Sequence, residues 1–175
     1  MTVLEAITTR ISVRRFTDRP VTDEQVNILL NAAFCAPSAC NKRPWEFVVV
    51  RDRDILANFA KRFRFQKMMT QAQLAIVVCG DKDRALDHDL MVNDCSAAVQ
   101  NILLAAHGMG LGACWCGLSP SNVARLTGEW IKAPENIVPV ATIAIGWPDE
   151  SRQQPDRFEP ERVHYDTFEP TDTDE

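Results

Sequence analysis

Two patterns of apolar residues alternate along the chain. Apolar residues at spacings of three and four are typical of helices with one buried face, and short runs of β-branched and aromatic residues are typical of strands. The patterns predict helices over residues 2–10, 23–36, 53–63, 87–107 and 119–126, strands over residues 45–50, 74–79 and 138–145, and a short strand or extended loop over residues 113–117. Because helices separate most of the strands, we expect an α/β or α+β sheet that is covered on both faces.

Helix-starting signals support two of these helices. Thr22 and Gln25 have the spacing of a capping box, in which each side chain binds the backbone N–H of the other residue. Ser119 and Pro120 are typical of an N-cap and a first helical residue. The helix after Thr22 is expected to turn one apolar face inward, formed by Val26, Leu29, Leu30, Ala33 and Phe34.

The helix expected over residues 87–107 is apolar nearly all round. Between residues 95 and 106 its polar residues are Ser96, Gln100 and Asn101. A helix of this kind is buried on more than one side, so we expect it at the centre of the domain or against a second subunit. The segment after Pro148 is instead polar and has few core residues, so it must lie on other structure.

Length and composition predict one compact globular domain. The chain has 175 residues, of which 46% are apolar and 25% charged, which excludes a disordered chain, a fibrous repeat and a small disulfide scaffold. We expect a single domain over residues 1–168 and an acidic tail over residues 169–175. No apolar stretch approaches the ~20 residues of a membrane-spanning helix, and Met1–Arg10 resembles no secretory signal, so we expect a cytoplasmic protein without a membrane partner.

The net charge of −5 is unevenly distributed. Residues 149–175 carry ten acidic and three basic residues, whereas residues 1–148 carry 14 acidic and 16 basic residues. This balance argues against a nucleic-acid partner and fits a small anion, such as a phosphate, bound by a few arginines. In an extended segment Arg10, Ser12 and Arg14 share one face and suit a phosphate, although they could equally form a solvated basic surface.

The cysteines and glycines carry weaker signals. The six cysteines lack zinc-binding spacing, so we expect reduced thiols that are mostly buried. Gly108-x-Gly110-x-x-Ala113 matches a dinucleotide-binding string but follows a helix instead of a strand, which excludes that interpretation. The glycines around Trp115 could let the backbone approach a flat ligand. The loop over residues 36–45 is either a binding loop or a connector.

Four motifs, in unbroken order from about residue 3 to residue 168, resemble the FMN-dependent nitroreductase family. They are Arg10-x-Ser12-x-Arg14-x-Phe16, Pro37-Ser38-Ala39-x-Asn41-x-x-Pro44-Trp45, residues 94–112 followed by Cys114-Trp115-Cys116-Gly117, and residues 138–148 followed by Arg157. The resemblance implies an α+β fold, a three-layer α-β-α sandwich with a mixed, mostly antiparallel sheet. It also implies an intertwined homodimer in which the C-terminal segment wraps the partner.

The resemblance further implies two FMN sites at the subunit interface. The N-terminal motif and Arg157 would hold the phosphate and flavin edge, the motif at residues 37–41 would come from the other subunit, and the Gly117 N–H would lie near flavin N5. No side chain is assigned as catalytic, since flavin N5 performs the chemistry. The implied FMN-binding residues are Arg10, Ile11, Ser12, Arg14, Pro37, Ser38, Ala39, Asn41, Lys67, Trp115, Cys116, Gly117 and Arg157.

The expected function is an FMN-dependent oxidoreductase with alternating half-reactions. NAD(P)H would reduce the flavin and leave, and an electron-poor acceptor such as a nitroaromatic or quinone would then be reduced. Two alternatives are a flavin-consuming or dehalogenating relative, and a flavin-binding dimer that acts as a redox sensor or carrier with Cys35, Cys40, Cys114 and Cys116 as thiol switches. Cys116 stands where many larger relatives carry an acidic residue, which leaves the acceptor and the choice between NADH and NADPH open.

Overall fold

The computed structural model describes residues 1–118 and 121–168. Its helices and strands follow the predicted positions closely, and the predicted capping signal at Ser119 and Pro120 and the acidic segment 169–175 lie outside the described residues. In chain order the elements are α1 (Val3–Thr9), α2 (Asp23–Phe34), η1 (Ala39–Asn41), β1 (Trp45–Val50), α3 (Arg53–Arg62), η2 (Arg64–Thr70), β2 (Leu74–Asp81), α4 (His88–Gly108), β3 (Gly112–Gly117), α5 (Ser121–Trp130), β4 (Ile137–Gly146) and η3 (Pro160–Arg162), where η denotes a 3-10 helix.

The four strands form one antiparallel sheet in the order β1-β2-β4-β3. The two central strands, β2 and β4, pair with each other. Strand β2 is apolar without alternation because its alternate side chains are buried in cores on opposite faces of the sheet. The N-terminal segment adds one isolated parallel bridge, between Ser12 and Ala113 at the edge strand β3. The sheet is therefore antiparallel throughout its four strands and mixed only through this bridge.

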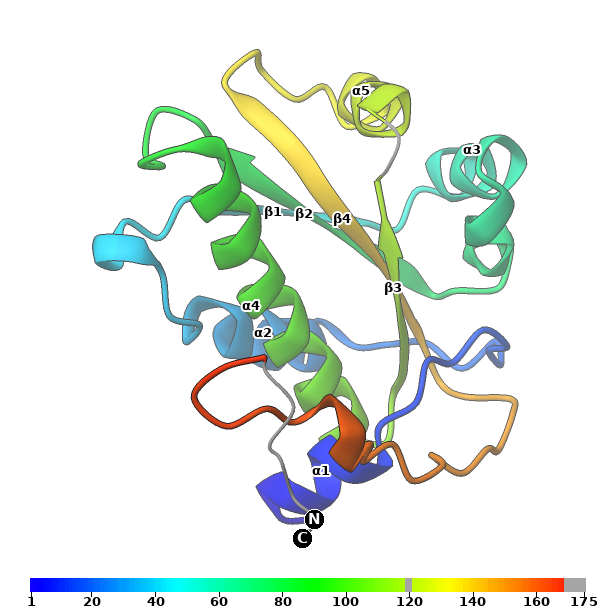
Figure 1. Cartoon of the computed structure of the whole chain (residues 1–175). Coiled ribbons are helices and arrows are strands. Elements are labelled where there is room, and N and C mark those ends of the chain that lie inside the picture. Colours follow the sequence, from blue (N-terminus) through cyan, green and yellow to red (C-terminus); the bar gives the residue numbers. More distant parts are fainter. Residues whose placement is uncertain (119–120, 169–175) are drawn as a thin grey trace, which may run out of the picture.

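Helices cover both faces of the sheet, so the domain has three layers (Figure 1). Alternate side chains of β2 point to opposite faces. Ile76 and Val78 pack in a core with α2 and α4, whereas Ala75 and Val77 pack in a second core with α3 and η2. This arrangement is the expected α-β-α sandwich.

The capping box at the start of α2 forms as predicted, and the inward face of that helix does so with one exception. The Thr22 N–H donates to Gln25 Oε1 at 3.0 Å, and the Gln25 N–H donates to Thr22 Oγ1 at 3.2 Å. Leu29 and Ala33 are fully buried. The expectation for Phe34 is wrong: its side chain is exposed and packs edge-on against Phe47 at the margin of the sheet, with ring centroids 5.1 Å apart.

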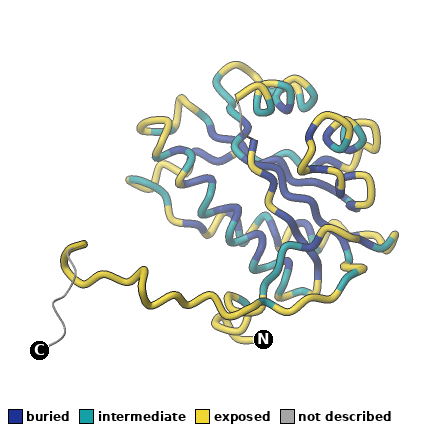
Figure 2. The backbone as a smooth tube through the Cα atoms, turned by 45° about the vertical axis from the view of Figure 1, so that its right-hand side comes forward, coloured by how far each residue is buried: buried dark blue, intermediate teal, exposed yellow. Residues whose placement is uncertain are grey.

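Several apolar residues remain exposed outside these two cores. Helix α1 has no buried residue, although Val3, Leu4 and Ile7 lie on it. The segment after residue 150 runs along the outside of the domain and projects from it in Figure 2, with Tyr165 and Phe168 exposed. Helix α4 lies at the centre of the domain, which is one of the two positions predicted for it; the other was against a second subunit. The exposed residues are those that a second copy of the chain would cover, and this pairing stays a prediction.

Most of the cysteines are buried, as expected. Cys79, Cys95, Cys114 and Cys116 are buried, while Cys35 and Cys40 are exposed. Burial raises the pKa of both Cys79 and Cys95 to about 12, so these two thiols stay protonated and unreactive. Among the described residues no helix is long and apolar enough to cross a membrane, and no group of three His, Cys, Asp or Glu side chains is placed to hold a metal ion.

Close packing fixes the segment after α1 against the end of the sheet. The Val13 N–H donates to the Ala113 carbonyl at 3.0 Å. At Gly112, where this segment crosses β3, an added Cβ would lie 2.7 Å from Val13 Cγ1 and 2.8 Å from Val13 Cβ. Only glycine therefore permits this approach, which places Ser12 and Arg14 beside β3.

We predict that Gly112→Ala destabilises the fold through this contact. The added methyl group must displace the Val13 side chain, including its Cβ, and overpacking of this kind lowers the free energy of unfolding by about 1–3 kcal/mol. Denaturant unfolding measures the change. Gly108→Ala is the matched control, because no atom lies within 4 Å of its added Cβ. Equal stability of the Gly112→Ala variant and the wild type would contradict this packing.

Candidate functional site

Two pockets meet at Arg14 on the edge of the sheet. The first has a volume of about 290 Å³ and is built from two segments that are far apart in the sequence. Its lining contains four arginines and no acidic residue, which makes it suited to a phosphate or another compact anion. The lining residues are Arg10, Ile11, Ser12, Arg14, Arg152, Gln153, Gln154, Pro155 and Arg157.

The Glu150 carboxylate joins these two segments. It accepts hydrogen bonds from the backbone N–H groups of Arg14, at 2.5 Å, and Arg15, at 3.2 Å, and forms an ion pair with Arg152 at 3.2 Å. The Arg14 N–H is the main reason that the pKa of Glu150 lies below its usual value, and the Arg152 and Arg15 cations lower it further. Glu150 therefore stays ionised at neutral pH and holds the backbone of Arg14 in place.

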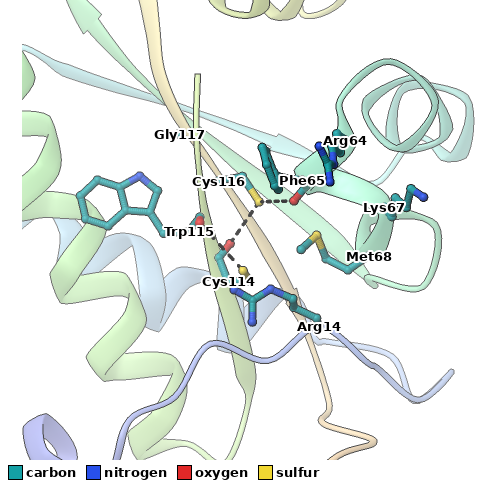
Figure 3. Close-up of a pocket in the computed structure, with 9 residues that line it drawn as sticks. All are labelled: Arg14, Arg64, Phe65, Lys67, Met68, Cys114, Trp115, Cys116 and Gly117. Atoms are coloured by element: carbon teal, nitrogen blue, oxygen red, sulfur yellow. Dashed lines mark hydrogen bonds between the residues drawn. The ribbon is translucent and has the colours of Figure 1, made fainter. Parts of the chain in front are cut away.

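The second pocket is a cleft of about 540 Å³ between β3 and the 3-10 helix η2 (Figure 3). Strand β3 forms one wall and η2 forms the other. Arg14 lies at the end nearest the first pocket, so one elongated ligand could occupy both. The lining residues are Arg14, Arg64, Phe65, Lys67, Met68, Cys114, Trp115, Cys116 and Gly117.

Buried polar contacts hold η2 against the sheet. Gln66 is 2% exposed, and its Oε1 accepts a hydrogen bond from Thr142 Oγ1 of β4 at 3.2 Å. The Cys116 thiol donates to the Phe65 carbonyl at 3.8 Å, directly across the cleft wall (Figure 3). At the other end of η2, Arg53 donates to the carbonyls of Thr70 and Ala72. These hydrogen bonds hold η2 at a fixed distance from β3 and so set the width of the cleft.

The side chains of β3 point alternately to the two sides of the strand. The Cys114 and Cys116 sulfurs lie on the side of η2, whereas the Trp115 ring points away from η2 and is partly exposed (Figure 3). The ring of Trp115 therefore lies outside the wall that faces η2.

The two thiols of β3 have opposite acidities. When Cys114 is ionised, the Cys116 thiol can donate to its sulfur in place of the Phe65 carbonyl. This hydrogen bond is the main reason that the pKa of Cys114 is lowered to about 7, and Arg14, Ser12 and Arg10 lower it further despite burial. The same hydrogen bond, together with burial, raises the pKa of Cys116. The negative charge that the pair can hold near neutral pH therefore lies on Cys114, beside the Arg14 cation.

Nine of the thirteen residues proposed for FMN lie in these two pockets. The first pocket contains Arg10, Ile11, Ser12, Arg14 and Arg157, and the second contains Lys67, Trp115, Cys116 and Gly117 together with Arg14. This placement fits the expectation, and the roles of the individual residues stay predictions.

The four residues Pro37, Ser38, Ala39 and Asn41 line neither pocket. Their loop is attached to α4, where the Ala39 N–H donates to Asp94 Oδ1 at 2.9 Å, and it is closed by a hydrogen bond from the Arg43 N–H to Ser38 Oγ at 2.9 Å. Within one chain this loop does not complete the site. The expectation that it serves the site of a partner therefore stays a prediction.

Sequence reasoning missed eight of the lining residues: Arg64, Phe65, Met68, Cys114, Arg152, Gln153, Gln154 and Pro155. Arg64, Phe65 and Met68 flank the predicted Lys67, and Cys114 lies two positions before Cys116 on the same face of a strand, so spacing could have found them. Arg152 lies in a segment that was judged only by its acidic balance, and no local signal distinguishes it from its neighbours.

Fold and site together define a class of protein: an α-β-α sandwich with an arginine pocket for an anion that opens beside a cleft for a flat ligand. The sequence model of the nitroreductase family matches residues 7–66 and 60–147. The chain therefore belongs to the nitroreductase family, and the predicted family and fold are confirmed.

Individual relatives agree with this assignment. The chain is 42% identical over 170 residues to a "Putative NADH dehydrogenase/NAD(P)H nitroreductase" of Methanothermobacter thermautotrophicus, covering 96% of this chain and 88% of the relative. A crystal structure with that same name from Bacteroides thetaiotaomicron is 40% identical, with a TM-score of 0.90 and coverage of 95% and 98%. A "putative nitroreductase in complex with fmn" from Desulfovibrio desulfuricans is 32% identical, with a TM-score of 0.83 and coverage of 97% and 99%.

We predict that Cys114 titrates near pH 7 in the ligand-free protein. The ultraviolet absorbance of the thiolate, recorded for the wild type minus Cys114→Ser, should rise with a midpoint near this pH. Arg14→Gln should move the midpoint upward, because it removes a cation that favours the thiolate. A midpoint at the ordinary thiol value of about 8.5 in the wild type would contradict the assignment.

Proposed function

We propose that the chain is an FMN-dependent oxidoreductase that transfers electrons from NAD(P)H to an electron-poor acceptor, such as a nitroaromatic or a quinone. The observation that carries the proposal is the junction of the two pockets at Arg14. An arginine-lined pocket opens beside a cleft with a sulfur-bearing wall, which matches a ligand with a phosphate at one end and a flat ring at the other. The names of the relatives support the same activity.

The residues of the first pocket would bind the phosphate. Arginine offers planar, forked donors to phosphate oxygens, and Arg10, Arg14 and Arg157 have no carboxylate partner among the described residues. Arg152 adds a fourth positive charge, although it is already paired with Glu150. The Ser12 hydroxyl and the bridge to Ala113 orient the segment toward β3.

The residues of the cleft would hold the ring. FMN, when bound, supplies the acceptance of a hydride from NAD(P)H and its delivery to the acceptor. Lys67 and Arg14 place positive charge at the cleft, which would favour an anionic reduced ring by Coulomb attraction. Gly117 has no atom within 4 Å of the position of an added Cβ, so its backbone is open to a close ligand. The protein binds and orients the reactants, and no nucleophile of its own is needed.

The complete site requires a homodimer in this proposal. Pro37, Ser38, Ala39 and Asn41 would reach the pockets of a partner, whereas the remaining residues come from one chain. The exposed apolar residues of α1 and of the C-terminal segment support the pairing, because a second copy would remove them from water. A cytoplasmic location stays a prediction.

A redox sensor or carrier is the second candidate, favoured by the acidic thiol of Cys114 in the cleft. Such a protein would bind flavin but turn over slowly with every acceptor. Steady-state NAD(P)H oxidation with menadione or nitrofurazone separates the two, since an enzyme sustains turnover with at least one acceptor.

We predict that the purified protein is yellow and that its flavin absorbance bleaches when NAD(P)H is added without oxygen.

Arg157→Ala should weaken FMN binding by about tenfold to over 100-fold, as expected for the loss of one charge-assisted contact worth roughly 1.5–3 kcal/mol. Equilibrium dialysis measures the affinity. Arg162→Ala is the control, because Arg162 lies in the same segment but pairs with Glu159 outside the pocket. A colourless protein that also fails to take up added FMN would refute the proposal.

We also predict that two inactive variants restore each other when mixed. Arg10→Ala removes a residue that the structure places in the pocket, and Asn41→Ala removes one that would come from the partner. A heterodimer of the two has one site with both substitutions and one intact site, so unfolding and refolding a mixture should restore FMN binding to a fraction of the sites. No recovery from a mixture that refolds as dimers would place Asn41 in the site of its own chain.

A further inference from the structure

The cleft has a cationic wall that FMN binding does not account for. Among its nine lining residues, three are cationic and none is acidic. Arg14 and Lys67 belong to the residues proposed for FMN. Arg64 does not, and neither does its neighbour Phe65, so these two side chains are available to whatever enters the cleft after the cofactor.

Arg64 is also electrostatically unpaired. Among the described residues, no carboxylate lies within 4.0 Å of the Arg64 guanidinium to form an ion pair with it. The Arg64 guanidinium carbon lies 5.6 Å from the centroid of the Phe65 ring. Lys67 likewise has no carboxylate partner there. An arginine at a cleft without a counter-charge is positioned to bind an anion from solution.

The backbone beneath these side chains is fixed. The flanking Gln66 is buried and bonded to Thr142, the Phe65 carbonyl accepts from the Cys116 thiol, and Arg53 holds the end of η2. The Phe65 ring itself is 78% exposed. An apolar ring left in water on a rigid support offers a flat face for stacking. Figure 3 shows Phe65 and Arg64 together on the η2 wall, opposite β3.

We propose that Arg64 and Phe65 select a substrate that is both planar and anionic: a conjugated ring system that carries a carboxylate, sulfonate or phosphate group. Phe65 stacks on the ring, and Arg64 binds the acidic group. The inference rests on the proposed function, since it names the substrate class of the same cleft. The acidic group can belong to the electron acceptor or to the phosphates of NAD(P)H, and both present the same chemistry to Arg64.

The electron balance of the reaction is unchanged by this selection. A quinone acceptor receives two electrons and one proton as a hydride from the reduced cofactor and a second proton from water, which gives the hydroquinone. NAD(P)H, oxidised to NAD(P)+ in the preceding half-reaction, supplies the hydride. Arg64 takes no part in proton transfer in this scheme, so it is a specificity-determining residue.

Two matched acceptors test the proposal in the holoenzyme: menadione, and the naphthoquinone that carries a sulfonate in place of its methyl group. Arg64→Gln should raise the KM for the sulfonate about five- to tenfold, as expected for one partly solvated charge contact, and leave the KM for menadione within about twofold. Added salt should bring the wild-type KM for the sulfonate close to that of Arg64→Gln, because salt screens the charge contact. Arg62→Gln is the control, because Arg62 is exposed two residues before Arg64, at the end of α3, and does not line the cleft.

KM values for the nucleotides and both naphthoquinones show whether Arg64 binds the acidic group of the acceptor or the phosphates of NAD(P)H. If Arg64→Gln raises the KM for NADPH or NADH and not that for the sulfonate, the proposal holds with the donor phosphate as the ligand. If both naphthoquinones and both nucleotides are unaffected, or if the sulfonate and menadione are weakened equally, the proposal is overturned. Phe65→Leu should raise the KM for both naphthoquinones, because both lose the stacking partner.

A binding measurement separates this inference from the proposed function. Equilibrium dialysis of the sulfonate against wild type, Arg64→Gln and Arg62→Gln needs no turnover, and the same five- to tenfold loss of affinity is expected for Arg64→Gln alone. If the protein binds no flavin, the proposed function fails, while this comparison still decides whether Arg64 binds an anion. Equal affinity of all three proteins for the sulfonate, with the KM values for both nucleotides also unchanged by Arg64→Gln, would overturn the inference even in an active enzyme.

Discussion

The attachment of residues 11–16 to the edge of the sheet is the constraint on which the site depends. Glu150 accepts the backbone N–H groups of Arg14 and Arg15, while the Val13 N–H donates to Ala113. Both contacts act on the backbone, so the arginine side chains stay free to face a ligand. Without this attachment Arg10 and Arg14 would be exposed cations on a mobile segment. The two pockets would then no longer meet at Arg14.

The distribution of charge follows from the same attachment. The cations concentrate where the N-terminal segment, β3 and η2 meet, and the one anion that the sulfur pair holds is Cys114, beside Arg14. Burial alone would protonate this thiol, as it does at Cys79 and Cys95. The difference between these cysteines shows that the arginines, together with the Cys116 thiol, outweigh desolvation at the site.

Local patterns predicted the elements well, because helices and strands are determined by periodicity and end signals that lie within a few residues. The capping box of Thr22 and Gln25 is one such case. Phe34 was placed wrongly because periodicity predicts which side of a helix faces the sheet, but it does not predict where along the helix the covering sheet ends. The order β1-β2-β4-β3 and the role of Glu150 depend on pairing between distant segments. Glu150 in particular was counted only as part of an acidic segment, although its carboxylate joins the two segments that form the arginine-lined pocket.

The loop at residues 38–43 is held in a strained conformation by contacts within its own chain. Cys40, Asn41 and Arg43 all have positive φ, at 47°, 55° and 47°, a conformation that costs free energy in residues other than glycine. Contacts from Asp94 to the Ala39 N–H and from Ser38 to the Arg43 N–H maintain it. Strain of this kind persists where the surrounding structure enforces it, and here the enforcing residue is Asp94 on α4. A partner that contacts this loop would therefore meet a segment that its own chain already holds in shape.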